Sequence, residues 1–191
     1  MRAGISVRLI IAITGASGAV YGQRLLEKLR EKNVETHLII SKAAEKVIKH
    51  ELEMTKEDIE KLADHSYDVD DWNSPSVSGS FKTDGMIIIP CSMKTLAGIA
   101  CGYSDNLVLR AADVTLKEKR LLILVPRETP LNVVHLRNML ALAEQGVAII
   151  PAMPAYYHKP KDIDGVVDFV VGRVLDLLDL EHTLYKRWRE A

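Results

Sequence analysis

The fold is decided by residues 7–18, which read Val7-Arg8-Leu9-Ile10-Ile11-Ala12-Ile13-Thr14-Gly15-Ala16-Ser17-Gly18. An apolar run of strand length ends there in a glycine turn, and a segment of helical period follows at about Gly18–Lys32. Leu25, Leu26 and Leu29 give that segment an apolar stripe. A buried strand that runs through a tight turn into an amphipathic helix begins a βαβ unit.

The same alternation continues along the chain. We expect strands at Val7–Thr14, Glu35–Ile40, Gly85–Pro90, Leu121–Pro126 and Val147–Pro151. Helices are expected at about Gly18–Lys32, Lys42–Glu53, Met93–Gly102, Asp105–Lys119, Leu131–Gln145 and Ile163–Leu178, and an ordered loop at Asp64–Lys82. The pattern predicts an α/β protein: one Rossmann-like or flavodoxin-like domain over residues 1–191, with a parallel sheet covered by helices on both faces.

Composition excludes several functions. The chain has 191 residues, 48% of them hydrophobic, and 25 basic and 26 acidic residues leave a net charge of −1. No overall field therefore favours nucleic acid or an anionic membrane. The apolar runs are shorter than the roughly 20 residues that span a bilayer, and the first leads straight into a glycine turn, so we expect a cytoplasmic protein. Two cysteines form no recognisable ligand set, and we expect no metal site.

Polar residues follow the predicted strands, at the edge where open parallel sheets bind ligands. After the first strand, the free N–H groups of the helix at Gly18 would suit an anion. Helix N-caps would look the same, and Lys94 also fits a solvated helix surface. The candidates for one cradle of a phosphate, a ribityl chain and a ring are Gly15, Ala16, Ser17, Ser41, Ser92, Met93, Lys94 and Thr95.

Three further groups carry charge or aromatic rings. Arg127 and Glu128, placed between two prolines at a strand end, suit the handling of an anionic leaving group, although an exposed ion pair is the alternative. Tyr157 with Arg173 would make a second phosphate site, with core packing as the alternative for the tyrosine. Arg110 and Lys117 lie seven apart on one helix face, which by itself favours a solvated basic stripe.

These segments, in this order, resemble the flavin prenyltransferase (UbiX/Pad-type) family, within the wider group of homo-oligomeric flavin-containing decarboxylase-like flavoproteins. The resemblance covers essentially the whole chain. It rests on Thr14-Gly15-Ala16-Ser17-Gly18, Ile40-Ser41-Lys42-Ala43-Ala44, Asp71-Trp72, Ser78-Gly79-Ser80, Cys91-Ser92, Thr95-Leu96, Asn106-Leu107, Arg110-Ala111-Ala112-Asp113, Leu116-Lys117-Glu118, Pro126-Arg127-Glu128, Pro154, Tyr157-His158 and Val167-Asp168-Phe169-Val170.

The resemblance implies transfer of a dimethylallyl group from dimethylallyl monophosphate to N5 and C6 of reduced FMN, without a metal, to make the prenylated FMN that UbiD-type decarboxylases use. Glu128 would act as acid and base, and Ser17 would relay a proton. Trp72 and Trp188 could stabilise allylic cation character. The implied FMN contacts are the cradle residues with Arg110 and Arg127, and the implied prenyl phosphate contacts are Tyr157, Arg173, Arg127 and Lys117.

The resemblance also implies a large homo-oligomer, a dodecamer, in which Lys117 joins the site from a neighbouring subunit. The tail over about residues 179–191 would contact such a neighbour. Three alternatives stay open: a flavin-dependent cysteine decarboxylase, a non-catalytic FMN carrier, and direct decarboxylation of an aromatic acid. Against the first, no cysteine follows Cys101, whereas those enzymes resemble one another in a late catalytic cysteine.

Overall fold

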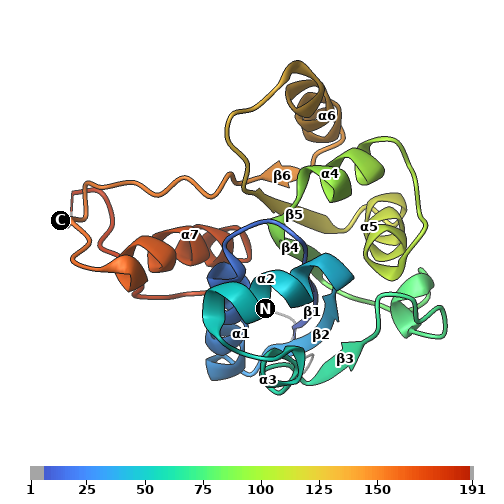
Figure 1. Cartoon of the computed structure of the whole chain (residues 1–191), viewed down its shortest axis with the longest axis horizontal. Coiled ribbons are helices and arrows are strands. Elements are labelled where there is room, and N and C mark those ends of the chain that lie inside the picture. Colours follow the sequence, from blue (N-terminus) through green and yellow to red (C-terminus); the bar gives the residue numbers. More distant parts are fainter. Residues whose placement is uncertain (1–6, 190–191) are drawn as a thin grey trace.

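The computed structural model describes residues 7–189. Its strands are β1 (Arg8–Ile13), β2 (Glu35–Ile40), β3 (His65–Tyr67), β4 (Gly85–Cys91), β5 (Leu121–Pro126) and β6 (Ala148–Ile149). Its helices are α1 (Ala19–Glu31), α2 (Lys42–Leu52), α3 (Lys56–Glu60), the 3₁₀ turn η1 (Pro75–Val77), α4 (Met93–Ala100), α5 (Leu107–Lys117), α6 (Val133–Glu144) and α7 (Ile163–Leu177) (Figure 1).

The six strands form one sheet in the order β3-β2-β1-β4-β5-β6, and every neighbouring pair is parallel. This is the Rossmann strand order, in which the chain leaves β1 toward one edge and returns to β4 on its other side. The predicted α/β fold with a parallel sheet is therefore confirmed. The break in direction between β1 and β4 is the topological switch point.

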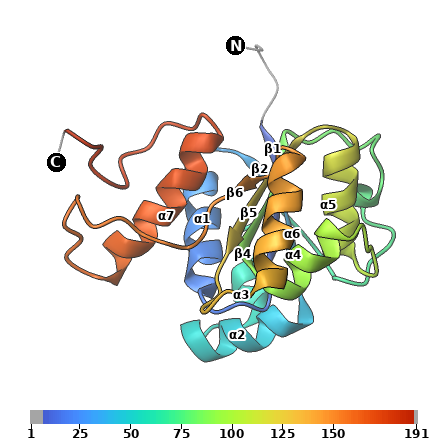
Figure 2. The same cartoon turned by 90° about the horizontal axis from the view of Figure 1, so that it is seen from above.

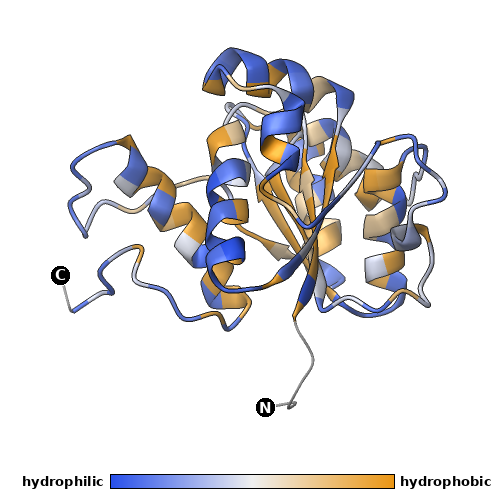
Figure 3. Cartoon of the chain, turned by 90° about the horizontal axis from the view of Figure 1, so that it is seen from below, coloured by the Kyte–Doolittle hydropathy of each residue, from blue (hydrophilic) through white to orange (hydrophobic). Residues whose placement is uncertain are grey.

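Helices cover both faces of the sheet (Figure 2). Alternate side chains of each strand point to opposite faces, so β1 sends Leu9, Ile11 and Ile13 into one core and Ile10 and Ala12 into the other. The first core lies under α1, α2, α3 and α7, and the second under α4, α5 and α6. Figure 3 shows the apolar strands enclosed between these layers.

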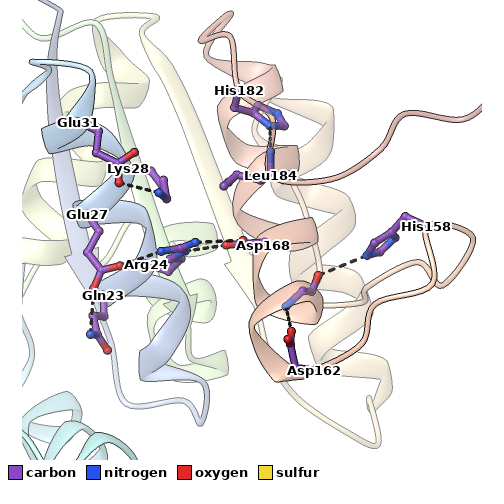
Figure 4. Close-up of polar contacts among 11 residues, drawn as sticks. Gln23, Arg24, Glu27, Lys28, Glu31, His158, Asp162, Asp168, His182 and Leu184 are labelled. Carbon is purple, nitrogen blue, oxygen red and sulfur yellow. Dashed lines mark hydrogen bonds and ion pairs between the residues drawn. The ribbon is translucent and has the colours of Figure 1, made fainter. Parts of the chain in front are cut away.

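A partly buried ion pair joins helix α7 to α1 (Figure 4). Arg24 Nε and Nη2 donate to the two carboxylate oxygens of Asp168 at 2.7 and 3.0 Å. This fork geometry is the strong form of an arginine–carboxylate contact, and it raises the pKa of Arg24. This contact fixes the position of α7, and of the side chains on α7, relative to α1.

Three expectations about secondary structure were wrong in detail. The expected loop at residues 64–82 contains the edge strand β3 and the turn η1, because Asp64 accepts hydrogen bonds from Thr36 N and Oγ1 and aligns the chain beside β2. Helix α3 was not expected; Thr55 and Asp58 form a capping box at its start. The fifth predicted strand is reduced to Ala148–Ile149, although Ile150 N still bonds to β5.

No helix within residues 7–189 is long and apolar enough to cross a membrane.

Candidate functional site

Thr14 joins β1 to β4 at the switch point. Its hydroxyl donates to Pro90 O at 2.8 Å and accepts from Ser92 N at 2.8 Å, while Thr14 N donates to Pro90 O at 3.2 Å. The side chain is 1% exposed, so a buried hydroxyl is satisfied on both sides. Thr14 thus places the Gly15 turn directly beside Ser92. Its sequence position at a strand end did not reveal this role.

Strand register aligns the other polar strand ends with Thr14. Ile13 pairs with Ile40, and Ser41 N donates to Ile13 O at 3.0 Å, so Ser41 lies beside the Gly15 turn. Cys91 pairs with Pro126, and Arg127 N approaches Cys91 O at 3.4 Å. The predicted gathering of strand-end residues at one edge is therefore present.

A cavity of about 330 Å³ opens at this edge, and we call it the switch-point pocket. Five of the eight predicted cradle residues line it. The full lining is Gly15, Ser41, Lys42, Ala43, Val69, Asp70, Ser92, Lys94, Thr95, Asp105, Asn106 and Val108. A Cβ on Gly15 would come within 2.4 Å of Ala43 Cβ, so only glycine lets α2 start this close to the turn. Ala16, Ser17, Met93 and Arg110 do not line this pocket in one chain.

Helix starts converge on the switch-point pocket. Ser41 caps α2 by accepting from Ala44 N at 3.2 Å, and Ser92 caps α4 by accepting from Thr95 N at 3.3 Å. Asn106 caps α5 in the same way through Leu109 N at 3.1 Å. The N-cap interpretation is therefore also right, and it adds to the binding interpretation, because helix N-termini and hydroxyls together favour an anionic, hydroxylated ligand. Asn106 entered the prediction only as part of a motif.

The start of α1 differs from what the sequence predicted. Its N-cap is Gly18 at a φ of 103°, where a side chain would be strained, and no side chain caps the helix. The N–H groups of Gly18 and Ala19 both donate to Glu51 Oε2 from α2, at 2.8 and 3.0 Å. The expectation of free N–H groups for a ligand anion at this helix was wrong, because a carboxylate of the chain itself binds them.

Glu51 is thus a site residue that no sequence pattern indicated. Burial raises the pKa of its carboxyl, but hydrogen bonds from Ser17, Gly18 and Ala19 and the charge of Arg127 outweigh burial and lower the pKa. Arg127 in turn donates from Nε to Ser17 O at 3.2 Å. Glu51, Ser17 and Arg127 therefore form a connected polar group at the end of β1.

Arg127 and Glu128 line a second cavity of about 470 Å³ beyond β5. Its walls are otherwise mainly apolar and include Leu131, Met139 and Met153. Glu128 accepts from Thr129 N at 3.0 Å and forms no ion pair among the described residues. The alternative interpretation of Arg127 and Glu128 as an exposed ion pair therefore fails. Glu128 instead borders a mainly apolar cavity that Arg127 also lines.

The rings of Tyr157 and Trp188 are in contact beside Phe169 of α7. Their rings lie edge to face with centroids 5.2 Å apart, and Tyr157 also contacts Phe169 at 6.0 Å. Arg173 on α7 donates to Asp176 Oδ2 at 2.8 Å. The residues predicted for the prenyl phosphate and for one aromatic wall therefore lie on α7 and the segments packed on it. We call Tyr157, Arg173 and Trp188 the α7 half-site.

Lys117, Arg110 and Trp72 lie on the opposite side of the molecule. Lys117 at the end of α5 pairs with Glu118 at 2.6 Å. Arg110 donates to Val77 O at 3.1 Å and to Asp113 at 2.8 Å, and Trp72 is half exposed in the same loop region. Figures 1 and 2 place α5 and α7 on opposite faces of the sheet, well apart from each other. One chain alone does not bring these residues to the α7 half-site.

One group of possible metal ligands occurs among residues 7–189, namely Glu35, His37 and His65, whose ligand atoms lie within 4.8 Å of one another. It stands at the amino ends of β2 and β3, away from the strand ends that line the switch-point pocket. Arg8 Nε already pairs with Glu35 Oε1 at 2.9 Å, and the two histidine rings are stacked rather than convergent. The predicted absence of a metal site stays a prediction.

The fold and the switch-point pocket define an α/β protein with a ligand crevice at the carboxyl ends of parallel strands, and comparisons with known proteins specify its family. The Flavoprotein family model matches residues 3–175. The chain is 50% identical over 182 residues to the flavin prenyltransferase UbiX of Methanocaldococcus jannaschii, covering 95% of this chain and 98% of that one. It is 55% identical over 184 residues to a probable UbiX-like flavin prenyltransferase of Escherichia coli O157:H7, covering 96% and 93%.

Solved structures agree. A dodecameric FMN-dependent UbiX-like decarboxylase from Escherichia coli O157:H7 superposes with a TM-score of 0.93 at 55% identity, covering 95% of this chain and 99% of that one. AnUbiX (PadA1), solved with FMN and dimethylallyl pyrophosphate, superposes with a TM-score of 0.95 at 49% identity, covering 96% and 98%. An FMN-dependent cysteine decarboxylase, TvaF, reaches a TM-score of 0.61 at 20% identity and shows only the shared fold.

The chain belongs to the flavoprotein family and, within it, to the UbiX-like flavin prenyltransferases. The predicted family membership is confirmed.

Proposed function

We propose that this enzyme transfers the dimethylallyl group of dimethylallyl monophosphate to N5 and C6 of reduced FMN. The observation that carries the proposal is the switch-point pocket, where the starts of α2, α4 and α5 converge, together with the separate cavity that Arg127 and Glu128 line. The first cavity suits a flavin nucleotide, and the second offers a charged pair for the departing phosphate. The prenylated FMN would serve a UbiD-type decarboxylase as cofactor.

The residues present fit FMN as the acceptor substrate. Ser41, Ser92, Thr95 and Asn106 supply hydroxyl and amide groups, and the helix starts supply N–H groups for a phosphate. Gly15 lets the turn after β1 lie close to the start of α2, because any side chain at position 15 would collide with Ala43. Ala16, Ser17, Arg110 and Arg127 would complete the contacts from the rim or from a neighbouring subunit.

The transfer requires one net proton movement. The bond between the allylic carbon and the phosphate oxygen breaks, and phosphate leaves with the bonding electrons. New bonds form from the prenyl carbons to N5 and C6 of the flavin. C6 loses one proton and the prenyl chain gains one, so these two changes cancel. The remaining proton, from N5, is taken up by the phosphate. Glu128 would carry that proton as base and then acid. Ser17, which hydrogen-bonds to Glu51, would relay a proton on the β1 side.

Arg127, Arg173, Lys117 and Tyr157 would stabilise charge on the departing phosphate, and this set of donors supports a reaction that needs no divalent metal. Trp72 and Trp188 present exposed rings, 50% and 70% exposed, that could face the allylic group.

A complete site in this proposal requires neighbouring copies of the chain. Lys117 and the α7 half-site lie at opposite ends of one molecule, so Lys117 would come from another subunit. The α6 surface supports assembly, because Val133, Val134 and Leu140 are each 60% exposed beside the second cavity. A dodecamer, as in the Escherichia coli relative, is the assembly we propose. The tail contact with a neighbour is part of this proposal, and residues 190–191 lie outside the described residues.

The test is incubation of the enzyme with reduced FMN and dimethylallyl monophosphate in the presence of a chelator, followed by mass spectrometry of the flavin. The expected product is FMN enlarged by one five-carbon unit. Unmodified FMN together with decarboxylation of a cysteinyl peptide or an aromatic acid would establish a decarboxylase instead. Unmodified FMN with no turnover, but with saturable FMN binding, would establish a carrier.

A further inference from the structure

The segment that follows α7 has no regular secondary structure, yet it is held closely against the helix. Leu180 N donates to Leu175 O at 3.0 Å, and Nζ of Lys32, the C-cap residue of α1, donates to the Glu181 carbonyl. Side chains of residues 182–188 then fold back over α7. We call residues 180–189 the tail segment.

One carboxylate, Asp176 on α7, collects the polar contacts of the tail segment. Its Oδ1 accepts from His182 Nε2 at 3.0 Å and from Arg187 Nη2 at 2.9 Å, and its Oδ2 accepts from Tyr185 OH at 2.5 Å. The side chain is only 14% exposed. Burial alone would raise the pKa of Asp176, but the hydrogen bonds from Tyr185, Arg187 and His182 lower it to about 2, so the carboxylate is ionised at neutral pH.

The same carboxylate holds Arg173. Arg173 Nη1 donates to Asp176 Oδ2 at 2.8 Å, one turn away on α7, and the Tyr185 hydroxyl contacts both Arg173 and Asp176. Arg173 is about half exposed, so without these contacts its long side chain would sample many rotamers. A guanidinium that is already oriented loses less freedom when it binds a phosphate.

The backbone of α7 is shaped to receive the tail segment. A Cβ on Gly172 would lie 2.6 Å from Tyr185 Cε1 and 2.8 Å from His182 Cε1. The rings of Tyr185 and His182 therefore rest directly on the helix backbone. Tyr185 also packs on Phe169 with ring centroids 4.8 Å apart, and Phe169 contacts Tyr157, which meets Trp188. The packing of the tail segment on α7 thus places Trp188 in contact with Tyr157.

We infer that Asp176 is a positioning residue for the α7 half-site: its carboxylate orients the Arg173 guanidinium and, through Tyr185, His182 and Arg187, docks the tail segment that brings Trp188 to Tyr157. This inference rests on the proposed function, in which Arg173, Tyr157 and Trp188 receive the prenyl phosphate. It assigns no chemical step to Asp176.

The main test compares Asp176→Asn with Asp179→Asn in the full-length enzyme. Both changes remove one charge at the same end of α7, but Asp179 is exposed and makes none of the tail contacts. For Asp176→Asn we expect the KM for dimethylallyl monophosphate to rise about tenfold, as for one lost charge-assisted contact. The affinity for FMN should stay within about twofold of the unmodified enzyme, because the switch-point pocket is untouched.

A merely structural role would give another result: less folded enzyme, hence a lower apparent kcat with an unchanged KM. Tyr185→Phe is the second variant, since it removes only the hydroxyl that contacts both Asp176 and Arg173, and it should raise the same KM by a smaller factor. An unchanged KM in Asp176→Asn and Tyr185→Phe, matching Asp179→Asn, overturns the inference.

A readout without catalysis separates this inference from the proposed function. Trp72 and Trp188 are the only tryptophans of the chain, so Trp72→Phe leaves Trp188 as the sole reporter. On that background, Asp176→Asn should lower the fluorescence anisotropy of Trp188, and inorganic phosphate should bind more weakly by calorimetry. If the unmodified enzyme forms no prenylated flavin, the proposed function fails, and these two measurements still decide whether Asp176 positions Arg173 and the tail. The positioning role is refuted if the anisotropy of Trp188 stays unchanged, and it is also refuted if the affinity for inorganic phosphate stays unchanged.

Discussion

Replacement of Glu51 by glutamine tests whether a carboxylate of the chain itself stabilises the start of α1. The change keeps the size of the side chain and one neutral oxygen acceptor but removes the charge that accepts from Gly18 N and Ala19 N. A hydrogen bond to a charged group contributes about 1.5–3 kcal/mol and a neutral one about 0.5–1.5 kcal/mol, so two weakened bonds give a loss of about 2 kcal/mol. Glu51 is exposed, and solvent screening reduces this to about 1 kcal/mol.

A loss of about 1 kcal/mol lowers the Tm of a chain of this size by about 2–4 °C. The assay is thermal unfolding followed by circular dichroism at pH 7. The control is Glu53→Gln, because Glu53 is the C-cap residue of the same helix and its side chain does not bind the start of α1. The pKa of Glu51 is lowered on folding, so its contribution is present above the ordinary value of 4.5 and is lost as the pH falls through the folded value. The difference between the two variants should therefore vanish in acid. Equal Tm values at pH 7, or a difference that persists in acid, would refute the reasoning.

Three further predictions concern the two binding regions. Glu128→Gln should keep FMN binding, measured by quenching of flavin fluorescence, and slow single-turnover prenyl transfer by about 10²–10⁴-fold; an unchanged rate removes Glu128 from the proton transfer. Tyr157→Phe and Arg173→Ala should weaken the apparent affinity for dimethylallyl monophosphate about tenfold to a hundredfold while FMN affinity holds, and an equal loss for both ligands would contradict two separate sites. Gly15→Ala should weaken FMN binding and lower the free energy of unfolding by about 1–3 kcal/mol, because the new Cβ would overlap Ala43. If the variant binds FMN and unfolds on heating in the same way as the unmodified enzyme, this account of the packing is wrong.

The sequence carried most of the fold because the signals were local. Buried strands such as β1 and β4 are continuous apolar runs, and the polar residues that follow them must meet at one edge once the strands are parallel. Gly15, Ser41 and Ser92 were predictable for that reason. Strand β3 was not, because two exposed residues and one half-buried residue at a sheet edge make no apolar run. Their position depends on the pairing of Asp64 with Thr36.

Glu51 and Asp176 mark the limit of prediction from sequence. Glu51 lies on the surface side of an ordinary amphipathic helix, and only the packing of α2 against α1 brings it to Gly18, 33 residues away. Asp176 resembles any helix-surface acid until the tail segment folds back on it. The assignments of Lys117 and Arg110 depend on family resemblance, and the fold of one chain does not test them. Lys117 lies on the opposite side of the molecule from the α7 half-site, and Arg110 does not line the switch-point pocket.

The separation of Lys117 from Arg173 within one molecule bears on how mutations in this protein combine in a cell. If each site draws one of these residues from each of two subunits, a chain that lacks Lys117 and a chain that lacks Arg173 fail for complementary reasons. Assembled together, they would form some sites that take Arg173 from the chain that lacks Lys117 and Lys117 from the chain that lacks Arg173. Two null alleles could then restore partial function when co-expressed, whereas two alleles with defects in Glu128 could not.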